Sequence, residues 1–119
     1  MLRRKFTLTL ACLTLAFSAS VAHAQKAAEL AAGLQYMVGT RYGALQVTSI
    51  KAVDQILVVQ IDGPSGWRSG LTPKLISDAL IEGFCSKSSG LFDDGVGMQI
   101  DSSEAGEDVW QGPLVTQCP

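Results

Sequence analysis

Apolar side chains recur every three to four residues in two stretches of the chain, and this spacing predicts two helices. The first stretch, residues 25–38, is rich in alanine and leucine. The second begins at Thr72, a residue type that caps helix N-termini, and continues from Pro73 to about Lys87. The buried stripe of this second helix is predicted to be Ile76, Ala79, Leu80 and Phe84, widened by Leu75 and Ile81.

Elsewhere β-branched residues alternate with polar ones, which predicts strands. Residues 44–62 hold two such runs and should form a hairpin that turns at Asp54-Gln55. The second run is largely apolar on both sides, as expected of an inner strand. Its all-apolar side should face the core and consists of Leu57, Val59 and Ile61.

Two further strands are predicted at residues 96–102 and 108–118, on either side of a polar turn. The expected order of elements is therefore α-β-β-α-β-β, with no internal linker. We expect a single α+β domain over residues 25–119, in which both helices pack on one face of an antiparallel sheet.

The first 24 residues have the three parts of a bacterial secretory signal peptide. A basic start is followed by an apolar run over residues 6–21, and Ala22-His23-Ala24 fits the small-x-small cleavage rule. The apolar run is short for a transmembrane helix. We expect cleavage before Gln25, a periplasmic or secreted location, and no membrane insertion after cleavage.

A second processing site is an open alternative. Leu10-Ala11-Cys12 faintly resembles a lipobox, and a lipid on Cys12 would tether the protein to a membrane. The apolar segment before Cys12 is only about six residues long, whereas signal peptides usually have 7–15. We therefore favour cleavage before Gln25.

The charge and the histidine content of the processed chain narrow the functional classes. Six lysines and arginines would face eleven aspartates and glutamates, a formal charge of about −5. This acidity argues against nucleic acid as a partner and against adhesion to anionic lipid. His23, the only histidine, would leave with the signal, which removes Ser-His-Asp and Cys-His catalysis and histidine-ligated metal sites. We predict a non-enzymatic protein with no catalytic residues, no metal and no cofactor.

Two cysteines would remain after cleavage, Cys85 and Cys118. An even pair in an exported chain predicts a disulfide, and the spacing does not match the CxxC motif of redox pairs. The bridge would close a loop of about 34 residues, which the loop-entropy model values at about 3–4 kcal/mol. Because small domains have a total stability of about 5–15 kcal/mol, the bridge would supply a large fraction of it.

Acidic residues gather in GLFDDGVGMQID, residues 90–101. If Gly95 took the glycine position of an EF-hand loop, Gly90 and Phe92 would fall at ligand positions, so calcium binding is disfavoured. A glycosidase-like carboxylate pair is a second alternative, with candidates Asp93, Asp94, Asp101 and Glu104. Aspartates beside glycine are common turn formers, and we favour a turn that leads into the third predicted strand.

Four residues are candidates for binding a protein partner: Trp67, Arg68, Tyr36 and Tyr42. Trp67 and Arg68 lie in the loop GPSGWRSG, and both residue types are frequent at binding hot spots. The alternative is that the aromatic side chains cover the core of a small domain.

The cysteines and their surroundings also resemble a known family. The helix sequence LISDALIEGFC ends in Cys85, a turn LFDDG leads into a strand with Val96, Met98 and Ile100, and the chain closes with VTQC at Cys118. This layout is similar to small periplasmic α/β proteins of Gram-negative bacteria with one helix-to-strand disulfide, in particular the α/β class of type II secretion pilotins. The order of elements is similar over most of residues 25–119, and the resemblance is specific to particular residues only at Cys85 and Cys118.

The resemblance implies a protein that binds a helical peptide of a secretin and carries secretin subunits to the outer membrane. Pilotins are lipoproteins, and this chain departs from them in its poor lipobox. The leading hypothesis is a non-enzymatic periplasmic adaptor that binds another envelope or secreted protein. The alternative is a secreted inhibitor of a cell-wall hydrolase such as lysozyme, since an acidic domain would associate readily with a basic enzyme. Partner identity and oligomeric state stay open.

Overall fold

The computed structural model describes residues 22–87 and 90–119. The predicted signal peptide, residues 1–24, lies outside the described residues except for its last three, and Cys12 lies wholly outside them. Cleavage before Gln25 and lipidation of Cys12 therefore stay predictions.

The first predicted helix is present but ends earlier than expected. Residues 22–33 are helical, and a 3-10 helix, η1 (Gln35–Met37), follows. Ala27 and Ala31 are buried against the sheet, where their small side chains let the helix approach closely. The side-chain amide of Gln35 donates to the carbonyl of Ile50 at 2.6 Å, which ties the end of this segment to the edge of the sheet.

The predicted hairpin is confirmed. It consists of β2 (Leu45–Val53) and β3 (Ile56–Gly63), paired antiparallel, and Asp54 turns the chain with a φ of 54°. A short strand that the sequence did not indicate, β1 (Arg41–Tyr42), pairs with the start of β2. It is only two residues long, too short to show a period of alternation.

The second predicted helix is α2 (Pro73–Lys87), and its predicted start is confirmed. The hydroxyl of Thr72 accepts a hydrogen bond from the backbone N–H of Leu75 at 3.2 Å. The predicted stripe is wrong on one flank, because Leu75 and Ala79 are exposed and Ser77 is buried. The helix packs through the flank that carries Ile76, Ser77, Leu80, Ile81 and Phe84, and a serine on that flank hides it from a hydrophobicity pattern.

The sheet is mixed, so the prediction of an antiparallel sheet is wrong at its centre. Two strands follow α2, β4 (Gly97–Glu104) and β5 (Glu107–Trp110), and the spatial order is β1-β2-β3-β4-β5. β3 and β4 are parallel, and the other neighbours are antiparallel. The physical reason is the crossover through α2, which carries the chain back to the end of the sheet where β3 began.

The last predicted strand, residues 108–118, is also only partly correct. Regular pairing stops at Trp110, and the chain then forms one isolated antiparallel bridge between Val115 and Met98. Pro113 lacks the N–H that a continued ladder needs. Gly112 passes so close to β4 that an added Cβ would lie 2.1 Å from the carbonyl oxygen of Ile100.

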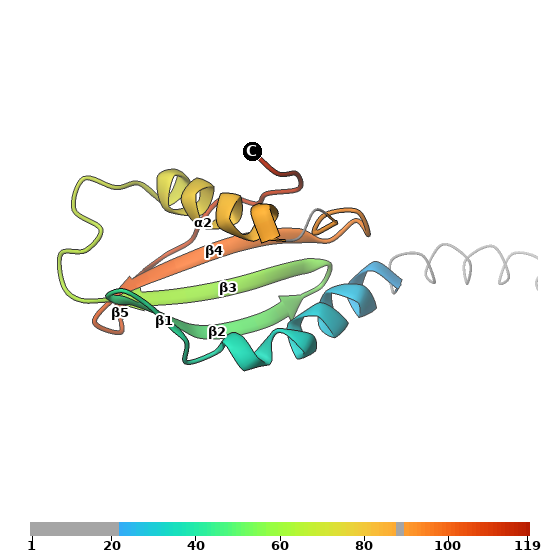
Figure 1. Cartoon of the computed structure of the whole chain (residues 1–119), viewed down its shortest axis with the longest axis horizontal. Helices are drawn as coiled ribbons and strands as arrows, with labels where there is room; N and C mark the ends of the chain where they lie inside the picture. Colours follow the sequence, from blue (N-terminus) through green and yellow to red (C-terminus); the bar gives the residue numbers. More distant parts are fainter. Residues whose placement is uncertain (1–21, 88–89) are drawn as a thin grey trace, which may run out of the picture.

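Both helices cover the same face of the sheet, as expected (Figure 1). Leu57, Val59 and Ile61 of β3 point into this layer, which confirms the predicted core side of that strand. Their neighbours across the ladders are apolar too, and residues from both helices complete one cluster: Val47, Ile50, Met98, Ile100, Ala27, Ala31, Ile76 and Ile81. The arrangement leaves β3 as the central strand of the sheet, in agreement with its apolar composition.

Candidate functional site

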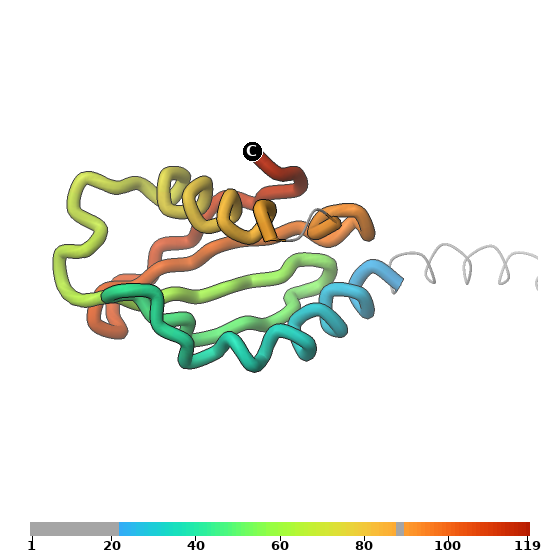
Figure 2. Tube along the Cα trace, in the orientation of Figure 1, coloured from blue at the N-terminus to red at the C-terminus, as the bar shows by residue number. Residues whose placement is uncertain are grey.

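A concave surface lies between α2 and residues 111–119. After β5 the chain runs back beside α2, and its end lies next to that helix (Figure 2). We call the space between α2 and residues 111–119 the C-terminal groove, and we call residues 111–119 its outer wall. Both walls, α2 and residues 111–119, lie in the C-terminal half of the chain, which also contains the two cysteines of the disulfide.

The C-terminal groove has two sections that share Asp78, Leu114 and Val115. The section near Cys118 has a volume of about 290 Å³, and α2 contributes Asp78 and Ile81 to it. The section near Thr72 is wider and more open, about 680 Å³. The section near Thr72 exposes mainly apolar surface, whereas the section near Cys118 exposes polar and apolar surface in about equal amounts. The groove therefore suits a ligand surface that carries both apolar and polar groups.

The charged groups in the C-terminal groove neutralise one another. The ammonium group of Lys74 lies 2.6 Å from the carboxylate of Asp78, one turn further along α2. This is an exposed pair between residues four apart on one helix, so it contributes little to stability. Its effect is to leave the middle of the groove without a net charge.

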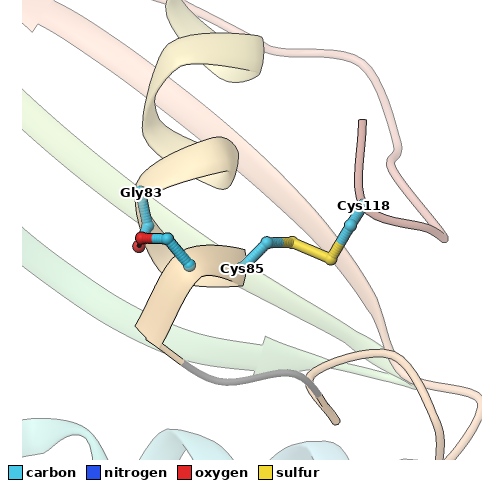
Figure 3. Close-up of a disulfide and its surroundings, with 4 residues drawn as sticks. Gly83, Cys85 and Cys118 are labelled. Carbon is cyan, nitrogen blue, oxygen red and sulfur yellow. Dashed lines mark hydrogen bonds between the residues drawn. A yellow bond between two sulfur atoms is a disulfide. The ribbon is translucent and has the colours of Figure 1, made fainter.

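The predicted disulfide is confirmed and closes one end of the groove. Cys85, near the end of α2, is bonded to Cys118 with 6.0 Å between the two Cα atoms. Figure 3 shows the bridge crossing from α2 to the end of the chain, with Gly83 on the other side of the same helical turn. An added Cβ at Gly83 would meet nothing within 4 Å, so this side of the turn is open.

Close packing positions the outer wall against β4. Val115 and Met98 exchange two backbone hydrogen bonds, both 2.8 Å long. The side chain of Leu114 lies over Gly97, where an added Cβ would be 2.8 Å from Leu114 Cδ1. Leu114 nevertheless stays 55% exposed, so it presents an apolar surface to the groove and to solvent.

Trp67 and Arg68, two of the predicted partner-binding residues, are folded inward. The indole N–H of Trp67 donates to the carbonyl of Ser103 at 2.8 Å, and its ring packs against the core. Arg68 is only 3% exposed, its guanidinium donates to the carbonyl of Ser102 at 3.1 Å, and it lies 4.0 Å from the centre of the Trp110 ring. A role in partner binding stays a prediction for both residues, while their visible role is to fix the loop between β3 and α2 to the end of the sheet.

Glu104 completes this arrangement. Its carboxylate accepts hydrogen bonds from the backbone N–H groups of Gly66 and Arg68, at 3.1 and 3.2 Å. It also lies 3.4 Å from Arg68 Nε, close enough for an ion pair but not aligned for a hydrogen bond. The Gly66 hydrogen bond, with smaller contributions from Arg68, lowers the pKa of Glu104 below its ordinary value of 4.5 against the opposing effect of desolvation.

A second carboxylate acts in the same way on the neighbouring strand. Asp62 accepts hydrogen bonds from the hydroxyl of Ser103 at 2.6 Å and from the N–H of Gly106 at 2.8 Å. The Ser103 bond, followed by the Gly106 bond, lowers the pKa of Asp62. These two acids therefore stabilise loops, and neither lies among the residues that line the C-terminal groove.

Tyr36 and Tyr42, the other predicted partner-binding residues, lie along the opposite edge of the sheet. Tyr36 is 78% exposed in η1, and Tyr42 is half-exposed in β1. The structure does not bring them to the C-terminal groove. Their contribution to partner binding stays a prediction, at a surface separate from that groove.

The acidic stretch forms the turn that was favoured from the sequence. Asp93 N–H bonds to the carbonyl of Gly90, and Gly95 has a φ of 75°, which glycine adopts readily. Asp94 lies 3.7 Å from the ammonium group of Lys26. Within residues 22–87 and 90–119, no group of three or more histidine, cysteine or acidic residues is placed to hold a metal ion.

Among the helices that the structure describes, none combines the length and the apolar composition that crossing a membrane requires.

The fold defines a small disulfide-bonded α+β domain with a groove between α2 and residues 111–119. No protein-family model matches the sequence, and no curated protein is significantly similar to it. Solved structures do resemble it. The pilotin AspS of the type II secretion system of Vibrio cholerae superposes with a TM-score of 0.66 at 14% identity, over 83% of this chain and 93% of AspS.

A second pilotin gives the same result. EpsS of the type II secretion system of Vibrio vulnificus has a TM-score of 0.65 at 17% identity, over 83% of this chain and 92% of EpsS. The resemblance to pilotins that the cysteine layout indicated is thereby confirmed as a likeness of fold. At such low identities the likeness concerns the fold alone.

Proposed function

We propose that this protein is a pilotin-like adaptor that binds a secretin subunit in the cell envelope and that it is not an enzyme. The observation that carries the proposal is the likeness of fold to two pilotins over 83% of the chain. Two features derived independently from the sequence agree with it: an export signal and a lack of histidine in the processed chain.

The C-terminal groove is the proposed site. It runs beside α2, whose 15 residues correspond to about 22 Å, the length of a helix of four turns. Leu114 and Val115 would contact an apolar stripe on such a helix, and the paired Lys74 and Asp78 would not oppose it. A helix that inserts one apolar face into a groove is a common mode of peptide recognition.

Charge supports the same partner class. The processed chain carries a formal charge of about −5, so a helix with basic residues beside its apolar stripe would be attracted to it. Such attraction raises the association rate and weakens with added salt.

The test is binding of the exported, oxidised protein to the detergent-solubilised type II secretin encoded in the same genome, followed by fluorescence anisotropy. The variant Leu114→Glu places a charge in both sections of the groove and should weaken binding at least tenfold with unchanged unfolding. The matched control is Val109→Glu on β5, because Val109 is 53% exposed and lines neither section.

Equal loss of affinity in the two variants would show that the C-terminal groove is not the site. No binding by the unmodified protein would contradict the proposed function itself. If affinity capture from a periplasmic extract then recovered a cell-wall hydrolase with suppressed activity, the inhibitor hypothesis would replace it.

A further inference from the structure

The two parts of the outer wall are held against the domain by different kinds of bond. The first part is held by hydrogen bonds to β4, from Val115 to Met98 and from the N–H of Gly112 to the carboxylate of Asp101 at 3.2 Å. For residues 116–119, no hydrogen bond to the rest of the described chain is present, and the fastening is the disulfide between Cys118 and Cys85. These four residues line the section of the groove near Cys118.

We propose that the Cys85–Cys118 disulfide makes the groove conditional on oxidation, so that the protein accepts its partner only after the bridge has formed. This inference rests on the proposed function, because its partner is the secretin helix proposed for the groove. In the oxidised chain the bridge holds residues 116–119 beside Ile81, and in the reduced chain this part of the wall is released.

The rest of the domain does not depend on the bridge in the same way. α2 is held to the sheet by Ile76, Ser77 and Ile81, all of which precede Cys85 in the helix. β4 is held by its ladder with β3, which runs along the full length of both strands. Reduction should therefore open the groove while the layer of helices stays packed on the sheet.

The chemistry of the switch is thiol–disulfide exchange. The two thiols lose two electrons and two protons to the disulfide of an envelope oxidoreductase, which leaves as a dithiol. Reduction is the reverse, by attack of a dithiol reagent on the bridge. Cys118 is exposed and Cys85 is half-buried, so a reagent can reach the bridge from the side of the outer wall. A chain that has not reached an oxidising compartment would then lack its binding site.

Linkage gives a second consequence. If oxidation raises the affinity for the partner by a given factor, the bound partner must make the bridge harder to reduce by the same factor. A tenfold effect corresponds to about 30 mV in the reduction potential of the bridge.

The experiment measures hydrogen exchange and secretin binding side by side, for the oxidised protein, for the protein reduced by dithiothreitol, and for a Cys85→Ser/Cys118→Ser variant that does not respond to the reagent. The isolated Val115–Met98 bridge is the last hydrogen-bonded contact before residues 116–119, so their release should let it fray and lower the protection of the Val115 and Met98 amides at least tenfold. The amides of β3 should stay protected, and secretin binding should weaken at least tenfold. Titration in glutathione buffers should show the shift of the bridge's potential when secretin is present.

Each departure has a distinct meaning. Exchange protection lost throughout β3 and β4 on reduction would overturn the inference, because the bridge would then hold the whole domain. Unchanged protection of Val115, or equal secretin affinity in both redox states, would overturn it as well. If neither redox state bound secretin, the proposed function would be contradicted, and with it the redox-dependent binding of secretin. Binding by the oxidised state alone would support both the proposed function and the redox dependence.

Discussion

Arg68 offers the sharpest test of how the loop between β3 and α2 is held. The substitution Arg68→Met keeps most of the aliphatic length of the side chain but removes the guanidinium group. The lost interactions are the hydrogen bond to the carbonyl of Ser102, the stacking on Trp110 and the ion pair with Glu104. A hydrogen bond from a charged donor contributes about 1.5–3 kcal/mol and a cation–π contact about 0.5–2 kcal/mol.

These contributions are not fully additive, and Glu104 keeps its two backbone donors when Arg68 changes. We therefore expect Arg68→Met to lower the free energy of unfolding by about 2–4 kcal/mol, within the range known for broken buried networks. Urea unfolding followed by circular dichroism measures this loss, and an unchanged m-value would show that the same surface is exposed. Arg68→Lys should lie between the two, because an ammonium group cannot reproduce the planar fork.

The exposed Arg41 provides the control. Arg41→Met should change the free energy of unfolding by less than about 0.5 kcal/mol. A cycle that combines Arg68→Met with Trp110→Leu should give a coupling energy of about 0.5–2 kcal/mol for the stacked pair. If Arg68→Met lowered the free energy of unfolding no more than Arg41→Met does, the contacts of Arg68 would not stabilise the fold as inferred. Weaker partner binding by such a stable variant would support the hypothesis that Arg68 contacts a partner.

Two further predictions concern stability. Because the pKa of Glu104 is lower in the folded than in the unfolded chain, its stabilising effect is complete well above pH 4.5 and declines as the pH falls below that value. Glu104→Gln should therefore be less stable than the unmodified protein at pH 7. In urea titrations at pH 4 and 3, the difference in free energy of unfolding between the two proteins should become smaller. The control is Glu107→Gln, at an exposed position, for which this difference should not shrink in the same way. Gly83→Ala should raise the free energy of unfolding by about 0.5–1 kcal/mol, since the position is helical and nothing lies within 4 Å of the added methyl group; a thermal midpoint equal to or below that of the unmodified protein would contradict this.

Local sequence patterns predicted the individual elements of this protein well. Thr72 and Pro73 marked the start of α2, alternating residues placed the β2–β3 hairpin, and the all-apolar side of β3 proved to be its core side. The disulfide followed from the two cysteines that the predicted processed chain retains after export. Each of these features depends on residues that are neighbours along the chain or on composition, so a sequence carries it directly.

The predictions that proved wrong concern features that depend on tertiary contacts between a helix, strand or loop and the elements packed against it. A hydrophobic stripe with Ser77 at its centre could not be recognised before the sheet beneath α2 was known, and Arg68 resembled a surface residue until Trp110 and Ser102 were placed around it. The antiparallel expectation for β4 overlooked the length of the crossover through α2, which favours a parallel return.

The sequence by itself therefore determined the disulfide and the order of most helices and strands. Only the tertiary structure decided the C-terminal groove, because its two walls, α2 and residues 111–119, are separated by β4 and β5 in the chain. Their approach is set by the close contact of Gly112 with Ile100, by the bridge between Val115 and Met98, and by the disulfide at Cys118. A concave surface arises from such distant contacts acting together, and periodicity within one segment contains no information about them.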